Sequence, residues 1–254
     1  DDKVKAFICT RDLKDEEYVN SHYVIMATKK GTVKKTSLEQ YSRPRQNGII
    51  AISIREDDEL LEAKLTTGTS QILLGLKSGK AIRFEESKTR PMGRSASGVR
   101  GIKLADENDE VIGMVSVHNF DDEILVVSEN GYGKRSNIDD YRITNRGGKG
   151  VKTISITQKT GGLVAIKNVS DSDDLMIINK SGIAIRMSVD DLRTMGRATQ
   201  GVKLINLKET DSIAAVAKVM KDEDNLDEVD IMDIEVKTED GTALDTDTTE
   251  NDKE

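Results

Sequence analysis

The chain has 254 residues, with 38 Lys and Arg, 46 Asp and Glu and a formal net charge of −8. Its single cysteine excludes a disulfide framework and fits a reducing compartment, and no apolar run approaches the roughly 20 residues of a membrane span. Residues 221–254 hold 15 acidic and 3 basic residues, a net charge of −12, so residues 1–220 carry +4. A basic body with an acidic tail predicts a polyanionic partner for the body.

Residues 1–20 are predicted to form an end strand and a connector. Lys3–Thr10 follows an acidic turn, like the last strand-like runs Glu59–Thr66 and Glu110–Val117 of two later units. We therefore expect it to be the end strand of a preceding repeat whose other strands lie upstream of Asp1.

Residues 21–220 contain four copies of a unit of about fifty residues. Each copy has a hairpin glycine (Gly31, Gly79, Gly131, Gly182) and a second glycine (Gly48, Gly98, Gly150, Gly201). Four strand-like runs make up each copy, and the third begins directly after the second glycine, as in Ile49–Ile54. Four strands per unit predict an all-β fold of propeller-like blades around an axis.

Basic residues recur at three addresses in the repeat. Three or four residues after the hairpin glycine stand Lys34, Lys35, Arg83, Lys134, Arg135 and Arg186. The loop before the second glycine holds Arg43, Arg45, Arg90, Arg94, Arg142, Arg146, Lys149, Arg193 and Arg197. Two residues after the second glycine stand Arg100, Lys152 and Lys203. Cations on glycine-containing loops suit phosphate contacts, so these residues predict a DNA-binding surface, the alternative being a solvated charged face.

The sequence offers little support for catalysis. No tyrosine has the basic cluster and carboxylates that metal-assisted strand transfer needs, and Tyr41 and Tyr141 stand at one repeated address that predicts packing. His22 and His118 lack the partnered spacing of a zinc site, so we expect no metal. The chain has no Trp and three Phe, so it offers few aromatic side chains on which the bases of a single strand could stack. This composition favours binding to the backbone of duplex DNA.

Four segments together resemble the C-terminal domains of the A subunits of DNA gyrase: Gly31–Thr36, Met92–Ile102, Asn130–Arg135 and Gly196–Val202. The resemblance covers about residues 1–220. It implies a β-pinwheel, here with four near-complete blades and part of a preceding one, that bends and wraps duplex DNA around a basic rim for ATP-dependent negative supercoiling. The family's heptapeptide box is matched only in part, by Thr144–Gly150, so we expect the true box upstream.

The same resemblance implies a non-catalytic accessory domain of a DNA topoisomerase. The cleaving tyrosine, ATP and Mg²⁺ would belong to other parts of an A2B2 assembly of gyrase A and B subunits in the bacterial cytoplasm, near the nucleoid. The alternative within the family is the C-terminal domain of the topoisomerase IV A subunit.

Two questions stay open at this level. The first is whether the chain has a different class of function, as a propeller-like scaffold for protein partners on which the cations are only part of a solvated surface. Residues 221–254 are predicted to be disordered, serving either for solubility or for competition with DNA, with the alternating segment Val229–Val236 able to dock on a strand edge.

Overall fold

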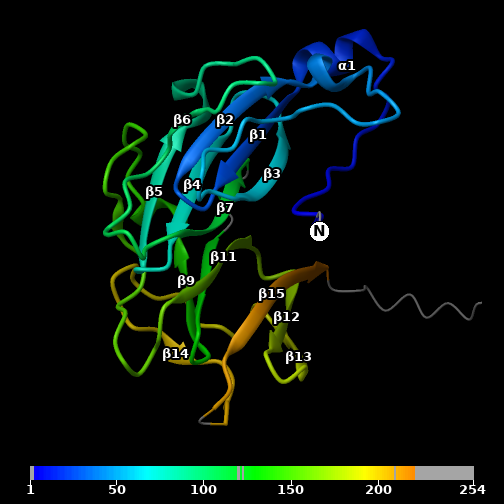
Figure 1. Cartoon of the computed structure of the whole chain (residues 1–254). Helices are drawn as coiled ribbons and strands as arrows, with labels where there is room; N and C mark the ends of the chain where they lie inside the picture. The colour runs from blue at the N-terminus through cyan, green and yellow to red at the C-terminus, as the bar shows by residue number, and fades with distance from the viewer. Residues whose placement is uncertain (1–2, 119–120, 122, 209, 221–254) are drawn as a thin grey trace, which may run out of the picture. The chain divides into compact units, whose positions relative to one another are not determined.

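Four antiparallel β-sheets follow one another along the part of the chain that the structure describes (Figure 1). The computed structural model describes residues 3–118, 121, 123–208 and 210–220. The predicted disordered tail, 221–254, therefore lies outside the described residues. Within them the one α-helix is α1 (Glu16–Ser21), and three short 3-10 turns accompany the strands: η1 (Leu38–Tyr41), η2 (Glu86–Lys88) and η3 (Ile138–Asp140). The prediction of an all-β fold is confirmed.

Three of the sheets have four strands and the last has three. In spatial order, the first holds β3 (Leu60–Thr66), β1 (Tyr23–Thr28), β2 (Thr32–Ser37) and β6 (Val99–Arg100). The second holds β7 (Val111–Val117), β4 (Gln71–Leu76), β5 (Lys80–Glu85) and β10 (Val151–Lys152). The third holds β11 (Leu163–Val169), β8 (Glu123–Ser128), β9 (Tyr132–Asn137) and β14 (Val202–Lys203). The fourth holds β15 (Ile213–Met220), β12 (Asp173–Asn179) and β13 (Ala184–Ser188).

Each complete sheet borrows its outermost strand from the next repeat. β6 belongs to the second repeat but pairs with β2, with Thr32 opposite Arg100 and Val33 opposite Val99. β10 and β14 pair in the same way with β5 and β9. The strand exchange ties consecutive repeats together. β13 has no such partner among the described residues.

The second glycine of the repeat makes this exchange possible. Gly98 has φ of +96°, and a Cβ there would lie 2.5 Å from the carbonyl oxygen of Val33. A side chain would therefore be strained by the backbone angle and would collide with the acceptor strand. The glycine lets the borrowed strand lie directly against its neighbour.

Apolar cores fill the spaces between consecutive sheets. β4 shows why the first run of a repeat is continuously apolar: Ile72 and Leu74 join a core with the first sheet, whereas Leu73 joins a core with the third repeat. A strand covered on both faces needs apolar residues at every position. Burying each Leu or Ile side chain contributes about 1.5–3 kcal/mol, so these cores stabilise the stack.

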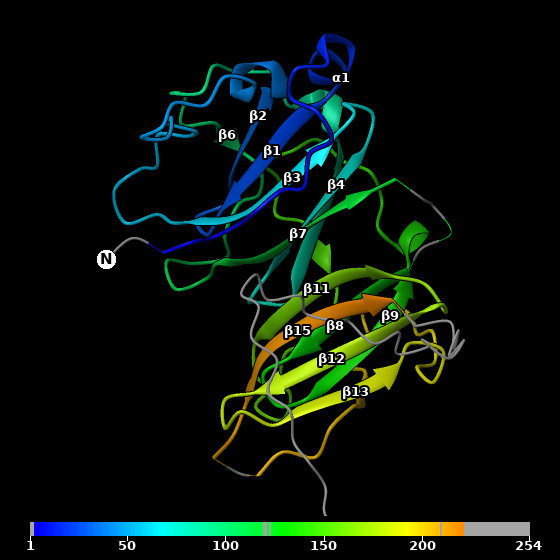
Figure 2. The same cartoon turned by 90° about the vertical axis from the view of Figure 1, so that its right-hand side faces the viewer.

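The last strands of the four repeats are neighbours on the inner side of the sheets. β11 packs against both β7 and β15 (Figure 2). Backbone hydrogen bonds repeat at their starts, from Val111 N to Lys29 O, from Leu163 N to Lys77 O and from Ile213 N to Glu129 O, at 2.8–2.9 Å. Consecutive repeats are thus joined at their inner strands as well as at their outer ones.

Two predicted strands are not formed. Residues 3–10 and 49–54 pair with no strand among the described residues, and Val4, Phe7 and Ile50 are 87%, 87% and 67% exposed. Both segments correspond to runs that elsewhere pair with a neighbouring strand, and no such neighbour lies among the described residues. The helix α1 was not predicted; Asp15 caps it by accepting a hydrogen bond from Tyr18 N at 3.1 Å.

Candidate nucleic-acid interface

The four basic loops of the sequence, 41–48, 90–98, 142–150 and 193–201, are called the arginine loops here. Each leads from a short turn to the third run of its repeat. Backbone hydrogen bonds connect each third run with the following loop: Ser53 N to Ala96 O at 3.3 Å, Lys103 N to Gly148 O at 2.8 Å, and Ser155 N to Thr199 O at 3.0 Å. The folded chain therefore makes consecutive loops neighbours, and the last three of them lead directly into the borrowed strands β6, β10 and β14.

One arginine in each of the last three loops reaches back to the preceding repeat. Arg94 Nη1 donates to Ile50 O at 3.4 Å and Arg146 Nη1 donates to Arg100 O at 3.0 Å. Arg197 Nη1 donates to Lys152 O. All three acceptors stand two residues after a second glycine, so the contact repeats with the sequence. These half-buried arginines staple the loops together while still facing solvent in part.

Most of the remaining predicted cations are exposed. They are Arg43, Arg45, Arg90, Arg100, Arg142, Lys149, Lys152, Arg186, Arg193 and Lys203. All but Arg186 belong to the arginine loops or to the borrowed-strand positions directly after them. Arg186 lies on β13, where its Nε is 2.7 Å from Asp174 Oδ2 of the same sheet. The loops thus carry a row of accessible positive charges suited to phosphate oxygens.

Four predicted contact residues are instead buried, and their assignment to an exposed rim is corrected. They are Lys34, Lys35, Arg83 and Lys134. Arg83 is 5% exposed; its Nε donates to Gln71 Oε1 at 2.7 Å, and its Nη1 donates to Ile138 O at 2.7 Å and Tyr141 O at 3.0 Å. Burial lowers the pKa of Arg83, although Asp139 and Glu85 oppose that shift. Arg83 therefore clamps its sheet to the turn of the next repeat.

Lys35 and Arg135, at the same address as Arg83, make equivalent clamps. Lys35 Nζ lies 3.1 Å from Glu86 Oε1 in the next repeat, and both side chains are buried. Arg135, half-buried, donates through Nε to Leu192 O of the next repeat and lies 3.1 Å from Glu123 Oε2. The address four residues after the hairpin glycine is therefore mainly one of attachment between repeats.

Lys34 and Lys134 are fully buried beneath two of the arginine loops. Lys34 Nζ donates to Ala51 O at 2.6 Å and to Arg94 O. Lys134 Nζ donates to Gly196 O at 2.6 Å, to Arg197 O and to Ser136 Oγ at 3.2 Å. Burial, aided by Arg94, lowers the pKa of Lys34 to about 8; burial, with Arg197 aiding and Asp140 opposing, lowers the pKa of Lys134 to about 8 as well.

A sequence signal for this burial was available. The residues three after the hairpin glycine are Lys34, Ile82, Lys134 and Ile185, so lysine alternates with isoleucine at one address. A position that accepts isoleucine in a β-strand is commonly covered by neighbouring residues. By contrast, no sequence pattern predicted the hydrogen bonds of Arg94, Arg146 and Arg197 to the preceding repeat, because each joins a side chain to a backbone carbonyl about 45 residues away.

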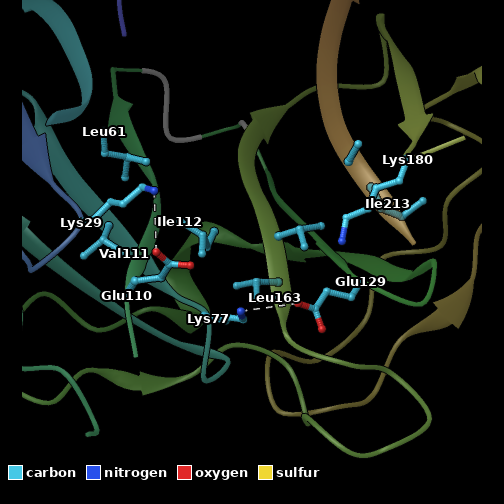
Figure 3. Close-up of a pocket in the computed structure, with 12 residues that line it drawn as sticks. Lys29, Leu61, Lys77, Glu110, Val111, Ile112, Glu129, Leu163, Lys180 and Ile213 are labelled. Carbon is cyan, nitrogen blue, oxygen red and sulfur yellow. Dashed lines mark ion pairs between the residues drawn. The ribbon is translucent and has the colours of Figure 1, made fainter. Parts of the chain in front are cut away.

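A cavity of about 460 Å³ lies apart from these loops, beside the starts of β7, β11 and β15 (Figure 3). Lys77 Nζ lies 3.7 Å from Glu129 Oε1 and Lys29 Nζ lies 4.0 Å from Glu110 Oε2 within it. These ion pairs join residues of consecutive repeats, and none of the predicted DNA-binding residues lines the cavity. Its contacts serve the attachment of repeats.

Neither a metal site nor a spanning helix is found among the residues that the structure describes. No group of three or more His, Cys, Asp and Glu side chains there is placed to hold a metal ion. In the same residues, no helix has the length and apolar character required to cross a membrane.

These features define a class: a β-pinwheel, related to the propellers, with strand-exchanged blades and a row of basic loops. Residues 22–67, 77–118, 122–170 and 173–220 match the DNA gyrase C-terminal domain family, described as a beta-propeller. The chain belongs to this family. It is 44% identical to the DNA gyrase A subunit of Staphylococcus aureus (strain NCTC 8325 / PS 47) over 254 residues, which is 100% of this chain and 28% of that protein. The chain thus spans little more than a quarter of that relative.

Solved structures agree with this assignment. The C-terminal domain of DNA topoisomerase IV superimposes with a TM-score of 0.74 and 25% identity, over 79% of this chain and 62% of that one. The DNA gyrase A C-terminal domain superimposes with a TM-score of 0.71 and 26% identity, over 79% of this chain and 67% of that one. The fold predicted from the repeat is confirmed by both.

Proposed function

We propose that the arginine loops bind the phosphates of duplex DNA and bend the duplex along their row. The observation that carries this proposal is the recurrence of accessible cations on four loops that hydrogen bonds join into neighbours. Contacts to phosphates from a row of loops fix the path of the backbone without reading its sequence. Preference among sequences would then come from how easily each duplex bends.

The whole-protein role that we propose is that of a DNA-wrapping domain of the gyrase A subunit. Its wrap would support ATP-dependent negative supercoiling, with strand cleavage, ATP and Mg²⁺ supplied by other parts of an A2B2 assembly of gyrase A and B subunits in the bacterial cytoplasm. The identity of 44% to a gyrase protein over the whole chain supports this over the role of topoisomerase IV. The proposal of a non-catalytic accessory domain is consistent with the site described above.

The test of DNA binding is its salt dependence. Log affinity falls with log salt by about 0.9 per neutralised phosphate. Replacing the exposed Arg90, Arg142 and Arg193 by Ala should flatten the slope by about 0.9 for each phosphate that is no longer neutralised. Replacing Lys64, Lys167 and Lys218 by Ala removes the same charge from the inner strands and should leave the slope unchanged.

The outcomes separate the candidate functions. Equal slopes for wild type and the arginine triple variant would remove these residues from the interface, and salt-insensitive or absent binding would favour the protein-scaffold alternative. Wrapping is tested separately, by relaxing a closed plasmid with the chain bound and measuring its linking number. An unchanged linking number, with binding intact, would leave bending but contradict chiral wrapping by this chain.

A further inference from the structure

Two of the arginine loops rest on a buried ammonium group. Lys34 and Lys134 have fully covered side chains, and each donates to the carbonyl of the staple arginine in the next repeat, Arg94 or Arg197. Each also donates to a second backbone carbonyl nearby, Ala51 O or Gly196 O, at 2.6 Å. Two carbonyl oxygens therefore converge on each ammonium, away from solvent.

The loop 142–150 is built without such a lysine. Its counterpart below is Ile82, which is 2% exposed and lies 3.4 Å from where a Cβ on Gly148 would stand. A cavity of about 360 Å³ is lined there by residues that include Ile82, Asn145 and Gly150. The fold therefore tolerates an apolar side chain at this address but then leaves space beneath the loop.

Burial of a charged amine is costly unless its hydrogen bonds are satisfied. The lowered pKa of both lysines, about 8, reflects that cost. Isoleucine in the second repeat shows that the fold does not require the charge at this address. What the ammonium adds is a donor for two carbonyls: for Lys34 one of them belongs to an arginine loop, and for Lys134 both do.

We propose that Lys34 and Lys134 are positioning residues for DNA binding, which hold the arginine loops 90–98 and 193–201 in the conformation that contacts phosphate. The inference rests on the proposed function. Without the ammonium, the freed carbonyls would turn towards water, since a buried carbonyl left without a donor is unfavourable. That turn would displace Arg94 or Arg197 and the neighbouring exposed arginine of the same loop.

The test replaces each lysine by the residue that the second repeat already uses, as Lys34→Ile and Lys134→Ile. Loop order is measured first without DNA, by amide hydrogen exchange. Amides of 94–98 should exchange faster in Lys34→Ile, whereas those of 144–149 should be unchanged. Unchanged exchange in 94–98 would overturn the proposal, and this readout does not depend on DNA binding.

DNA affinity is then measured below the melting temperature in a double-mutant cycle. Lys34→Ile should weaken binding roughly tenfold, as expected when a charge-assisted hydrogen bond is removed. In the Arg94→Ala background, where the loop that Lys34 supports has already lost its staple, Lys34→Ile should weaken DNA binding little further. In the Arg197→Ala background, which alters a different loop, the two losses of affinity should multiply. Full multiplication with Arg94→Ala, or unchanged affinity in a folded Lys34→Ile, would overturn the positioning role.

Failure of the proposed function gives a different pattern. In that case the arginine variants themselves would bind DNA like the wild type, whatever the exchange rates show. If the arginine variants weaken binding and the lysine variants do not, only the positioning role is wrong.

Discussion

Replacing Arg83 by Met should destabilise the fold without changing how DNA binding depends on salt. The guanidinium is 5% exposed and donates hydrogen bonds to Gln71 Oε1, Ile138 O and Tyr141 O. Methionine retains much of the apolar stem but leaves these acceptors without that donor. The two carbonyls belong to the turn that begins the next arginine loop, so the destabilisation falls on the joint between the second and third repeats.

The magnitude follows from opposing effects. Hydrogen bonds to a charged group contribute about 1.5–3 kcal/mol each, which gives about 5–9 kcal/mol for three. Removing a buried charge relieves several kcal/mol of desolvation. The expected net decrease in the free energy of unfolding is about 2–4 kcal/mol, or roughly 4–16 °C in melting temperature for a domain of this size.

The matched control is Arg186→Met, at the same address in the fourth repeat. The Arg186 side chain is 44% exposed and pairs with Asp174 within its own sheet, and an exposed ion pair contributes about 1 kcal/mol or less. Urea and thermal unfolding by circular dichroism measure both variants, and DNA titrations at several salt concentrations follow at a temperature where both are folded. If Arg83→Met is as stable as the wild type, or flattens the salt slope while folded, the assignment of Arg83 as a clamp is wrong.

Four other predictions concern the loops, the glycines and the tail. Because the pKa of Lys34 and Lys134 is lowered to about 8, raising the pH from 7 to 9.5 should weaken DNA binding by the wild type more than by the Lys34→Ile, Lys134→Ile double variant; the charged groups that face the two amines are Arg94, Arg197 and Asp140. Over the same range the contribution of these lysines to the free energy of unfolding should rise, because lysine in the unfolded chain holds its proton up to about pH 10.5. Urea titrations at a series of pH values measure this contribution, and a fall would contradict the prediction. Gly98→Ala should cost about 2–4 kcal/mol because strain adds to collision, whereas Gly48→Ala, with φ of +74° and nothing within 4 Å, should cost only about 1 kcal/mol, and equal decreases in urea titrations would contradict the role of close approach. Deleting residues 221–254 should tighten DNA binding at moderate salt if the tail competes with DNA, and unchanged affinity would leave it a solubilising segment.

The sequence by itself determined the repeat, the positions of most of its strands along the chain and the places where cations recur. Apolar runs, hairpin glycines and a period of about fifty residues are local signals, and they report local structure. The same signals predicted the loops that carry Arg90, Arg142 and Arg193, whose side chains are exposed in the structure.

For the cations four residues after the hairpin glycine, only the tertiary structure decided which ones face solvent. Arg83 and Arg186 stand at the same address in the sequence, yet Arg83 is enclosed by the next repeat and Arg186 is open to solvent. The difference arises because each complete sheet borrows a strand from the following repeat and brings that repeat's turn over the strand at Arg83 and its equivalents. Burial is therefore set by contacts between residues some 45–60 positions apart, to which hydrogen bonds from Lys34 and Arg83 to the next repeat contribute. A periodic pattern fixes the address of a residue within its repeat, but the neighbour that covers the address is fixed by packing.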